Sequence, residues 1–417
     1  MSHHQTFSAS MPTSGADQPF DRQCWHALFA SFLGWTLDAF DFFTVVFLVG
    51  ILARQFGVGK SDIIWSLTAT LAMRPLGALV FGWFADRYGR RAALMSNVIC
   101  FSVLEVLCGF SQSYLFFLVV RTLYGIGMGG EWGVGASLTM ETAPRRRRGL
   151  VSGVLQSGYS VGYLLAALSA RFILPAWGWR AMFWLGGAPA LLALYVRFSA
   201  PEPAAWRMSR AKSSRAILAA VFRDWKSFAY LVFLMTLMMF LSHGSQDLYP
   251  DFLKTVHHLA SNTVSMVAVL YNLGAILGAV VFGQLSERSG RRMGMVLALA
   301  LSLAVIPLWA FGKSLEMLAA GAFLMQMGVQ GAWGIIPAHL TELAPASARS
   351  LLPGLAYQLG ILIAAPTNTF EYLIRDRVGY RWALGGFELV VIVFCAIALA
   401  CGEEHRGRDF LAAAKEE

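Results

Sequence analysis

Charged side chains are scarce in this chain. Asp, Glu, Lys and Arg make up 14% of its 417 residues, whereas soluble globular domains average about 25%. Hydrophobic residues make up 57% of the chain. These proportions exclude an ordinary soluble domain and indicate a protein that lies in a membrane.

Cysteines and long polar segments are also scarce. The five cysteines show neither metal-binding spacing nor an extracellular pair, so we expect thiols in an apolar core and no metal or other cofactor. No polar segment is long enough to hold a soluble domain, which argues against most enzyme and receptor architectures. Residues 1–25 lack the basic and apolar pattern of a signal peptide, and we interpret them as a tail.

The chain is rich in apolar runs of about 20 residues, each long enough to span a bilayer. This pattern predicts an all-α membrane protein whose twelve transmembrane helices form two pseudo-symmetric six-helix bundles. We expect a tail at 1–25, a bundle at 26–199, a linker at 200–228, a second bundle at 229–401 and a tail at 402–417. The predicted spans are 27–52, 62–84, 92–111, 113–138, 150–174, 181–199, 229–254, 262–285, 293–312, 315–338, 351–373 and 383–401.

The two halves of the chain repeat each other at a constant offset. The block Gly82–Arg91 aligns with Gly283–Arg292, 201 positions later, and Gly127–Gly133 aligns with Gly328–Gly334 at the same offset. A duplicated apolar half is typical of alternating-access transporters, whose binding site lies between the repeats.

Lysine and arginine are unevenly distributed among the loops. They gather after the second, fourth and sixth spans and in the C-terminal tail. By the positive-inside rule, this bias predicts that both termini are cytoplasmic. The net charge of +9 then follows from membrane topology, and we expect no nucleic-acid partner.

Acids recur beside the loop arginines in both halves. Topology alone would require only the bases, so the acids favour ion pairs between the bundles. Such pairs would close the cytoplasmic side and separate when it opens. The predicted cytoplasmic gate consists of Asp86, Arg90, Glu141, Arg148, Glu287, Arg291, Glu342 and Arg349.

Ionisable residues inside the spans are candidates for function, because a charge at the bilayer centre costs about 2.5–3.5 kcal/mol on insertion scales. None of the main candidates is repeated at the 201-residue offset, which separates them from the duplicated scaffold. We interpret Glu105 as structural. The candidates are Asp38, Asp41, Arg74, Arg121, Glu131, His243 and Asp247.

Side-chain chemistry assigns roles to these candidates. Arginine stays charged in proteins and can hold a carboxylate through two hydrogen bonds, so we predict that Arg74 and Arg121 attract an anionic substrate. Buried carboxyls and histidine can take up and release protons. A merely structural pair between Asp41 and Arg74 is an alternative for those two. The predicted proton-coupling set is Asp38, Asp41, Glu131, His243 and Asp247.

Two groups of motifs resemble those of a known family. Gly82–Arg91, its repeat, and the segment Arg121–Gly129 are similar to signatures of the major facilitator superfamily, which implies its fold. The segment Ser242–Asp247 resembles the seventh-helix signature of the lactate/pyruvate–proton symporters, in the sialate:proton symporter branch. This chain departs from that signature at two positions. It has Met239 where the signature has Asn, and Asp251 where the signature has Thr. The resemblance implies proton coupling by His243 and Asp247, and a substrate path along Ser242, Ser245 and Gln246.

Together these features predict a secondary transporter that takes up a small monocarboxylate, such as lactate or pyruvate, with a proton. A symporter of sialic acid or of an aromatic acid is the nearest alternative. An intramembrane enzyme that uses His243 and Asp247 as acid and base, and a transporter-derived sensor, are more distant alternatives. We expect a monomer in the cell membrane, the inner membrane if the host is bacterial, whose partners are a small organic anion, a proton and the lipid bilayer.

Overall fold

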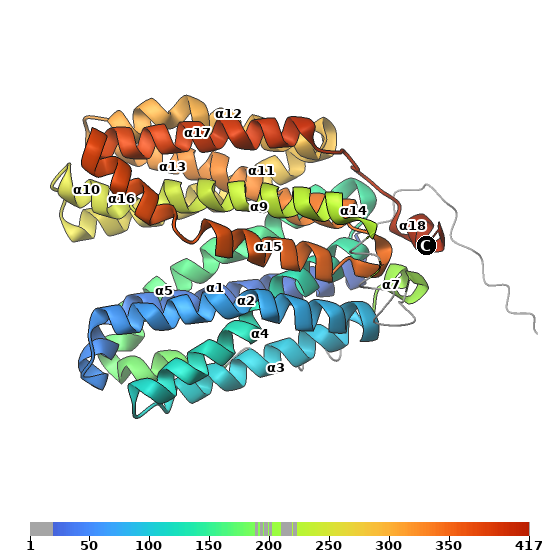
Figure 1. Cartoon of the computed structure of the whole chain (residues 1–417), viewed down its shortest axis with the longest axis horizontal. Coiled ribbons are helices and arrows are strands. Elements are labelled where there is room, and N and C mark those ends of the chain that lie inside the picture. Colours follow the sequence, from blue (N-terminus) through green and yellow to red (C-terminus); the bar gives the residue numbers. More distant parts are fainter. Residues whose placement is uncertain are drawn as a thin grey trace, which may run out of the picture.

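The computed structural model describes residues 20–187, 202–209 and 223–416, with the single positions 191, 195, 199 and 219. Most of the predicted tail 1–25, part of the predicted span 181–199 and about half of the linker 200–228 lie outside the described residues. All regular elements in the described part are helices, and they form two bundles that lie side by side (Figure 1).

Within the described residues, the first bundle contains five long helices. They are α1 (Arg22–Phe56), α2 (Lys60–Tyr88), α3 (Arg90–Gly109), α4 (Tyr114–Thr142) and α5 (Arg148–Leu185), with the short helix η1 (Arg145–Arg147) before α5. The helix α5 changes direction at Gly178, where φ is 76°. It therefore contains the fifth predicted span and the start of the sixth.

The second bundle contains more and shorter helices. They are α9 (Trp225–Gln246), α10 (Tyr249–Thr255), α11 (Ser261–Ser289), α12 (Arg291–Phe311), α13 (Leu315–Trp333), α14 (Ile336–Leu343), η2 (Ala346–Ala348), α15 (Leu351–Ala364), α16 (Thr367–Val378) and α17 (Tyr380–Cys401). Two small helices, α7 (Ala204–Ser209) and α18 (Phe410–Glu416), lie together at one end of the molecule (Figure 1).

Three predicted spans are each divided into two helices. The seventh is α9 and α10, the tenth α13 and α14, and the eleventh α15 and α16. A proline lies at or just after each break, at Pro250, Pro337 and Pro366. Proline has no N–H to donate and clashes with the preceding turn, so these sites favour a new helix over a continued one.

The repeat is visible in the backbone conformation. Positive φ angles occur at Gly57 and His258, at Gly89 and Gly290, and at Gly178 and Gly379. The members of each pair are 201 residues apart, so both halves turn at equivalent positions. We call the end of the molecule that carries Gly89 and Gly290 the motif end, and the opposite end the far end.

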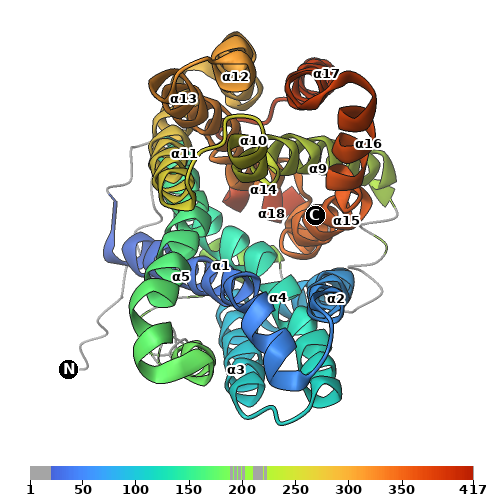
Figure 2. The same cartoon turned by 90° about the vertical axis from the view of Figure 1, so that its left-hand side faces the viewer.

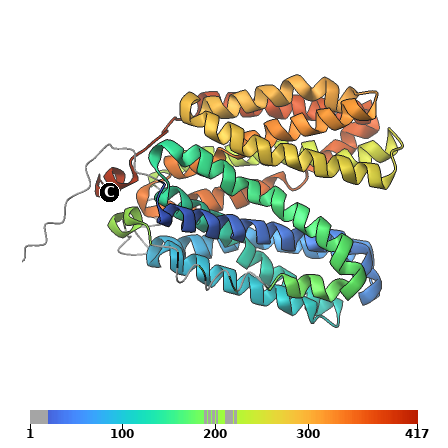
Figure 3. The same ribbon diagram turned by 180° about the vertical axis from the view of Figure 1, so that it is seen from behind.

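The two bundles meet along two pairs of helices, α5 with α11 and α2 with α15. Figure 2 views the molecule from the far end and shows both pairs, and Figure 3 shows the first pair from behind. Glycines allow the close approach at the motif end. A Cβ atom at Gly153 would overlap the carbonyl oxygen of Ala279, and one at Gly133 would lie 2.7 Å from the Cα of Gly354.

The exterior of the bundles is suited to lipid. Eight helical segments in the described residues are long and apolar enough to cross a membrane. Large apolar side chains such as Trp65, Phe172 and Trp177 are exposed on the outside, which fits a lipid-facing surface with aromatic residues near its edges.

We predict that Gly77→Ala and its repeat equivalent Gly278→Ala each destabilise their own bundle. A Cβ atom at Gly77 would overlap the carbonyl oxygen of Ile126, and one at Gly278 that of Met327. Overpacking of this kind costs about 1–3 kcal/mol. Thermal unfolding in detergent should show a lower midpoint for both variants. Gly386→Ala is the control, because its Cβ would meet nothing within 4 Å; an equal loss in the control would contradict the packing explanation.

Candidate functional site

At the motif end, each bundle places a carboxylate on the first turn of a helix of the other bundle. Asp86, near the end of α2, accepts hydrogen bonds from the backbone N–H groups of Ser350 (3.1 Å) and Leu351 (2.9 Å), where α15 begins. Glu287 of α11 accepts one from the N–H of Gly149, at the start of α5. The free N–H groups and the dipole of a helix start favour a carboxylate there.

Buried arginines join this contact from both bundles. Arg90 pairs with Asp86 and donates to Glu141 at 3.0 Å. Glu141 also accepts a hydrogen bond from Arg349 of the other bundle at 3.2 Å. The Glu141 carboxylate therefore links a guanidinium of each bundle.

The repeated half builds the same arrangement. Glu342 accepts hydrogen bonds from Arg291 at 2.9 and 3.1 Å and lies 3.7 Å from Arg148 of the first bundle. Arg291 also pairs with Glu287 at 3.0 Å. The structure thus brings the eight predicted gate residues into two repeat-equivalent clusters of four, and each cluster crosses between the bundles; together they form the gate network.

The C-terminal tail covers this network. The ring of Phe410 lies between two repeat-equivalent arginines, with the guanidinium of Arg148 3.6 Å and that of Arg349 4.1 Å from the ring centroid. Asp409 forms an ion pair with Arg145 at 3.2 Å. The tail therefore contacts arginines of both bundles and adds to the closure of the motif end.

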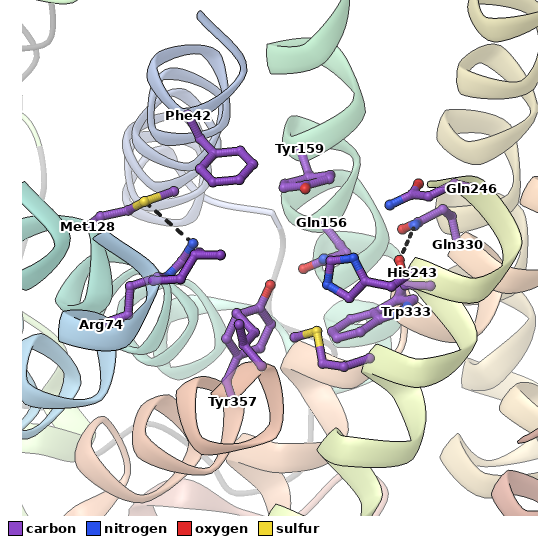
Figure 4. Close-up of a pocket in the computed structure, with 14 residues that line it drawn as sticks. Phe42, Arg74, Met128, Gln156, Tyr159, His243, Gln246, Gln330, Trp333 and Tyr357 are labelled. Atoms are coloured by element: carbon purple, nitrogen blue, oxygen red, sulfur yellow. Dashed lines mark hydrogen bonds between the residues drawn. The ribbon is translucent and has the colours of Figure 1, made fainter. Parts of the chain in front are cut away.

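A cavity lies between the bundles, beyond the closed motif end. Its volume is about 590 Å³, counting the space open to solvent. Helices α1, α2, α4 and α5 of the first bundle and α9, α13 and α15 of the second line it (Figure 4). The lining residues are Phe42, Leu71, Arg74, Met128, Gln156, Tyr159, Met239, Ser242, His243, Gln246, Gln330, Trp333, Tyr357 and Ile361.

Aromatic rings form part of the cavity wall, and a further ring packs behind them. Tyr357 stacks on Trp132, with ring centroids 4.4 Å apart, and meets Trp333 edge to face at 5.7 Å. Trp132 and Trp333 are equivalent in the repeat, so each bundle supplies one tryptophan. The Trp132 indole N–H donates to Gln156 at 3.1 Å. These contacts make a rigid, mostly apolar surface between the cavity and the gate network.

Arg74 supplies the one guanidinium among the residues that line the cavity. Its Nε donates to Gln358 of the second bundle at 2.9 Å, and an Nη lies 3.9 Å from the Asp38 carboxylate. Gln358 in turn donates to the carbonyl oxygen of Gly129 at 3.2 Å. The Arg74 side chain is 5% exposed, so it is held at the cavity wall and not extended into solvent.

Asp41 and Arg121 lie behind the cavity wall, and neither is a lining residue. Arg121 pairs with Glu105 at 2.8 Å, and both side chains are fully buried. Asp41 accepts a hydrogen bond from Tyr124 at 3.3 Å. The ion-pair partner of Arg74 is therefore Asp38 and not Asp41, and the acid interpreted as structural, Glu105, neutralises Arg121.

Glu131 and Asp38 share an unusual environment in the first bundle. Both are fully buried, and their carboxylate oxygens have no hydrogen-bond partner within the described residues. The Glu131 carboxylate fills the space beside Gly34 of α1, where a Cβ atom would overlap it. Since an ionised carboxylate without a partner is costly in apolar surroundings, the site of Glu131 favours the protonated acid, whereas Asp38 lies near the guanidinium of Arg74.

The seventh-span residues divide between the cavity and its surroundings. Ser242, His243 and Gln246 line the cavity, and Figure 4 shows His243 and Gln246 opposite Arg74. His243 contacts Asp247 at 2.9 Å, and their side chains are 33% and 30% exposed. Ser245 instead faces α13, where Gln326 donates to it at 2.9 Å.

Sequence reasoning missed several residues of the site. Gln156, Gln330 and Gln358 are neutral amides, and the search for charges passed over them. The repeat could have indicated Gln156, because it is equivalent to Tyr357 and both residues line the cavity.

The two residues that depart from the seventh-helix signature lie in different places. Met239 lines the cavity, whereas Asp251 accepts a hydrogen bond from Tyr380 at 2.8 Å.

Known proteins resemble this chain over most of its length. The Major Facilitator Superfamily model matches residues 27–246, and a model described as "Sugar (and other) transporter" matches residues 217–406. A carboxylic acid transporter protein homolog of Saccharomyces cerevisiae is 32% identical over 85% of this chain, which spans 62% of that relative's length. The sialic acid transporter NanX of Escherichia coli is 29% identical over 89% of this chain and 92% of its own. The proton:xylose symporter XylE has the same fold, with a TM-score of 0.76 at 17% identity over 94% of this chain and 98% of its own.

We predict that Asp86→Asn opens the motif end. The variant loses the charge that binds Arg90 and the start of α15, which is worth about 1–2 kcal/mol. Spin labels on the exposed residues Tyr88 and Arg288 should report a larger population of long distances. Asp62→Asn, at the far end, serves as the control. An unchanged distance distribution in Asp86→Asn would contradict the closing role of this contact.

Proposed function

Because the chain belongs to the Major Facilitator Superfamily, we propose that it takes up a small monocarboxylate, such as lactate or pyruvate, together with a proton. The family and its relatives are transporters and not enzymes, and the all-α fold of the family is that predicted from the loop motifs. The proposal concerns the finer properties: the substrate, the proton and the residues that bind them.

The observation that carries the proposal is the position of Arg74. A guanidinium at the wall of a mostly apolar cavity offers two parallel N–H groups to a carboxylate, in a place where water competes weakly. Ser242 and Gln246 lie across the cavity and would hydrogen-bond the keto or hydroxyl group of the substrate. Arg121 is neutralised by Glu105, so we assign it to packing of the first bundle and not to substrate binding.

Asp38 provides a way to couple the proton to the substrate. Its carboxylate lies 3.9 Å from Arg74 and competes with a substrate carboxylate for the same guanidinium. When Asp38 takes up a proton, this competition ends and Arg74 becomes available to the anion. Binding of the substrate then favours the protonated form of Asp38, as linkage between two sites requires. Asp41 and Glu131 are buried acids of the same bundle and would take part in proton coupling together with Asp38.

Alternating access would follow from the gate network. We propose that the bundles at 26–199 and 229–401 rock about the cavity, and that the gate pairs separate when the motif end opens. With the motif end cytoplasmic, as the loop arginines predict, the described state faces outward. The chain would lie in the cell membrane with both termini in the cytoplasm and would act as a monomer.

An acid with a larger apolar body is the second candidate substrate. The cavity is lined by Phe42, Tyr159, Trp333 and Tyr357, and Met239 stands where the monocarboxylate signature has Asn. Flat aromatic surfaces favour stacking with an unsaturated or aromatic acid. The relative NanX is named as a transporter of sialic acid, a larger acid with many hydroxyl groups, for which this lining offers fewer partners.

Uptake into proteoliposomes tests the proposed function. Under an inward proton gradient, labelled lactate or pyruvate should accumulate, and sialate and benzoate decide between the alternatives. We predict that Arg74→Gln lowers the initial rate by a factor of about 30 or more, equivalent to about 2 kcal/mol of lost binding. Arg74→Lys should recover only part of it, because lysine lacks the planar fork. Arg54→Gln, at the exposed end of α1, is the control, and full uptake by Arg74→Gln would refute the assignment.

We further predict that Asp38→Asn separates exchange from accumulation. Asparagine cannot release a proton, so Arg74 stays available to the anion while the proton gradient no longer drives uptake. Exchange of labelled for unlabelled substrate should persist, and gradient-driven accumulation should be lost. Gradient-driven accumulation at the wild-type level in Asp38→Asn would show that another group carries the proton.

A further inference from the structure

A pair of buried glutamates lies in the second bundle, outside the cavity lining. Glu371 is on α16 and Glu388 on α17, and both residues are 0% exposed. None of their carboxylate oxygens has a hydrogen-bond partner within the described residues, nor does either acid form an ion pair there. Two neighbouring buried acids with no ion-pair partner among the described residues are an unusual feature in a bundle interior.

The groups that face this pair are an acid and a thiol. Asp247 of α9 is within electrostatic range of Glu371, and Glu371 is within range of Glu388. Cys395, on α17, also lies near Glu388. Several arginines of the packed elements have other partners, and Arg381 of α17 lies near His257. Arg375 of α16 pairs with Asp376, and Arg291 and Arg292 of α12 are engaged at the motif end.

The pair is connected to the cavity through α9. His243 lines the cavity and contacts Asp247 at 2.9 Å. Asn368, one turn before Glu371 on α16, donates to the same Asp247 carboxylate at 3.2 Å. On the other side, the Glu388 carboxylate lies against Gly244, the residue after His243, where a Cβ atom would be 2.5 Å from Oε1. Glu388 therefore abuts the helix segment that carries His243, and Glu371 lies one turn from the residue of α16 that bonds Asp247.

Elementary electrostatics determines what such a pair can bind. A buried carboxylate without a partner pays a large desolvation cost, and a second carboxylate nearby adds repulsion. Each glutamate is relieved of this cost when it binds a proton. Asp247 is 30% exposed, so it offers a route by which protons from water can reach Glu371.

Resting on the proposed proton coupling, we propose that Glu371 and Glu388 form a proton-binding site that is loaded through Asp247 and His243. A proton taken from water by Asp247 passes to a carboxylate oxygen of Glu371, and then to Glu388 behind it. The second bundle thus binds a proton in addition to the one that Asp38 takes up, and Arg74 of the first bundle binds the anion. Because α9 contacts both sites, its movement during the cycle would release proton and anion together.

Infrared titration of purified protein in lipid tests the site without any substrate. The C=O stretch of protonated carboxyls is followed as the pH is raised, in the wild type and in Glu371→Gln, Glu388→Gln and Glu316→Gln. The first two variants should each lose part of the titrating signal, whereas Glu316→Gln, an exposed acid of α13, should leave it unchanged. An unaltered signal in both buried variants would overturn the proposal. Loss of the wild-type signal on adding Na⁺ at constant pH would also overturn it, because the site would then bind a metal cation.

Transport assays test whether this site serves coupling. In Glu388→Gln, exchange of labelled substrate should persist, which also shows that the variant is folded, and gradient-driven accumulation should fall by about tenfold or more. Unchanged accumulation in both Glu371→Gln and Glu388→Gln would overturn the role in coupling. A wild type that shows the infrared signal but accumulates none of the acids tested would refute the proposed function and leave the proton site standing.

Discussion

Two carboxylates that cap helices across the bundle interface hold this transporter in its described state. Asp86 satisfies the free N–H groups at the start of α15, and Glu287 does the same for α5. If the bundles separated here, buried donors would lose partners at about 1–3 kcal/mol each. Opening thus needs a compensating interaction elsewhere in the molecule. The cavity lies beyond this closed end of the interface.

The same contact explains why the interface is rich in small residues. A carboxylate can reach the first turn of a helix in the other bundle only if the backbones approach closely. Gly149 and Gly153 allow α5 to pack against α11, and Gly82 allows α2 to meet α15 at Leu351. In a membrane, association of helices depends on close packing and polar contacts, since lipid is as apolar as the side chains. The glycines and the loop acids therefore serve the same contact between the bundles, which explains why both recur in the two halves.

Charge is distributed unequally between the bundles, and this inequality gives each a different chemistry. The first bundle contains buried arginines beside buried acids, with Arg74 near Asp38 and Arg121 paired with Glu105. The second bundle contains Glu371 and Glu388, whose carboxylates have no hydrogen-bond or ion-pair partner among the described residues. A guanidinium near a cavity suits an organic anion, whereas unpartnered acids suit a proton. Gln358 of the second bundle donates to Gly129 and accepts from Arg74. A movement of Arg74 would therefore change a hydrogen bond between the two bundles.

The sequence by itself determined the class of the protein, the helical fold, the repeat and the identity of the loop network. These follow from local and periodic properties: apolar runs of membrane length, a constant offset, and acids and bases at fixed places in loops. The positive φ angles at Gly89 and Gly290 repeat as the residues do, because a tight turn is specified by its own few residues. Only the tertiary structure decided which buried charges share a site. Arg74 and Arg121 look alike in the sequence, yet one meets the cavity and the other meets Glu105, because the rotation of a helix about its axis depends on the helices packed around it. In the sequence, nothing distinguishes Glu371 of α16 and Glu388 of α17 as members of one site. Within the described part of the chain, their carboxylates have no partner. Only the packing of the helices in three dimensions determines this.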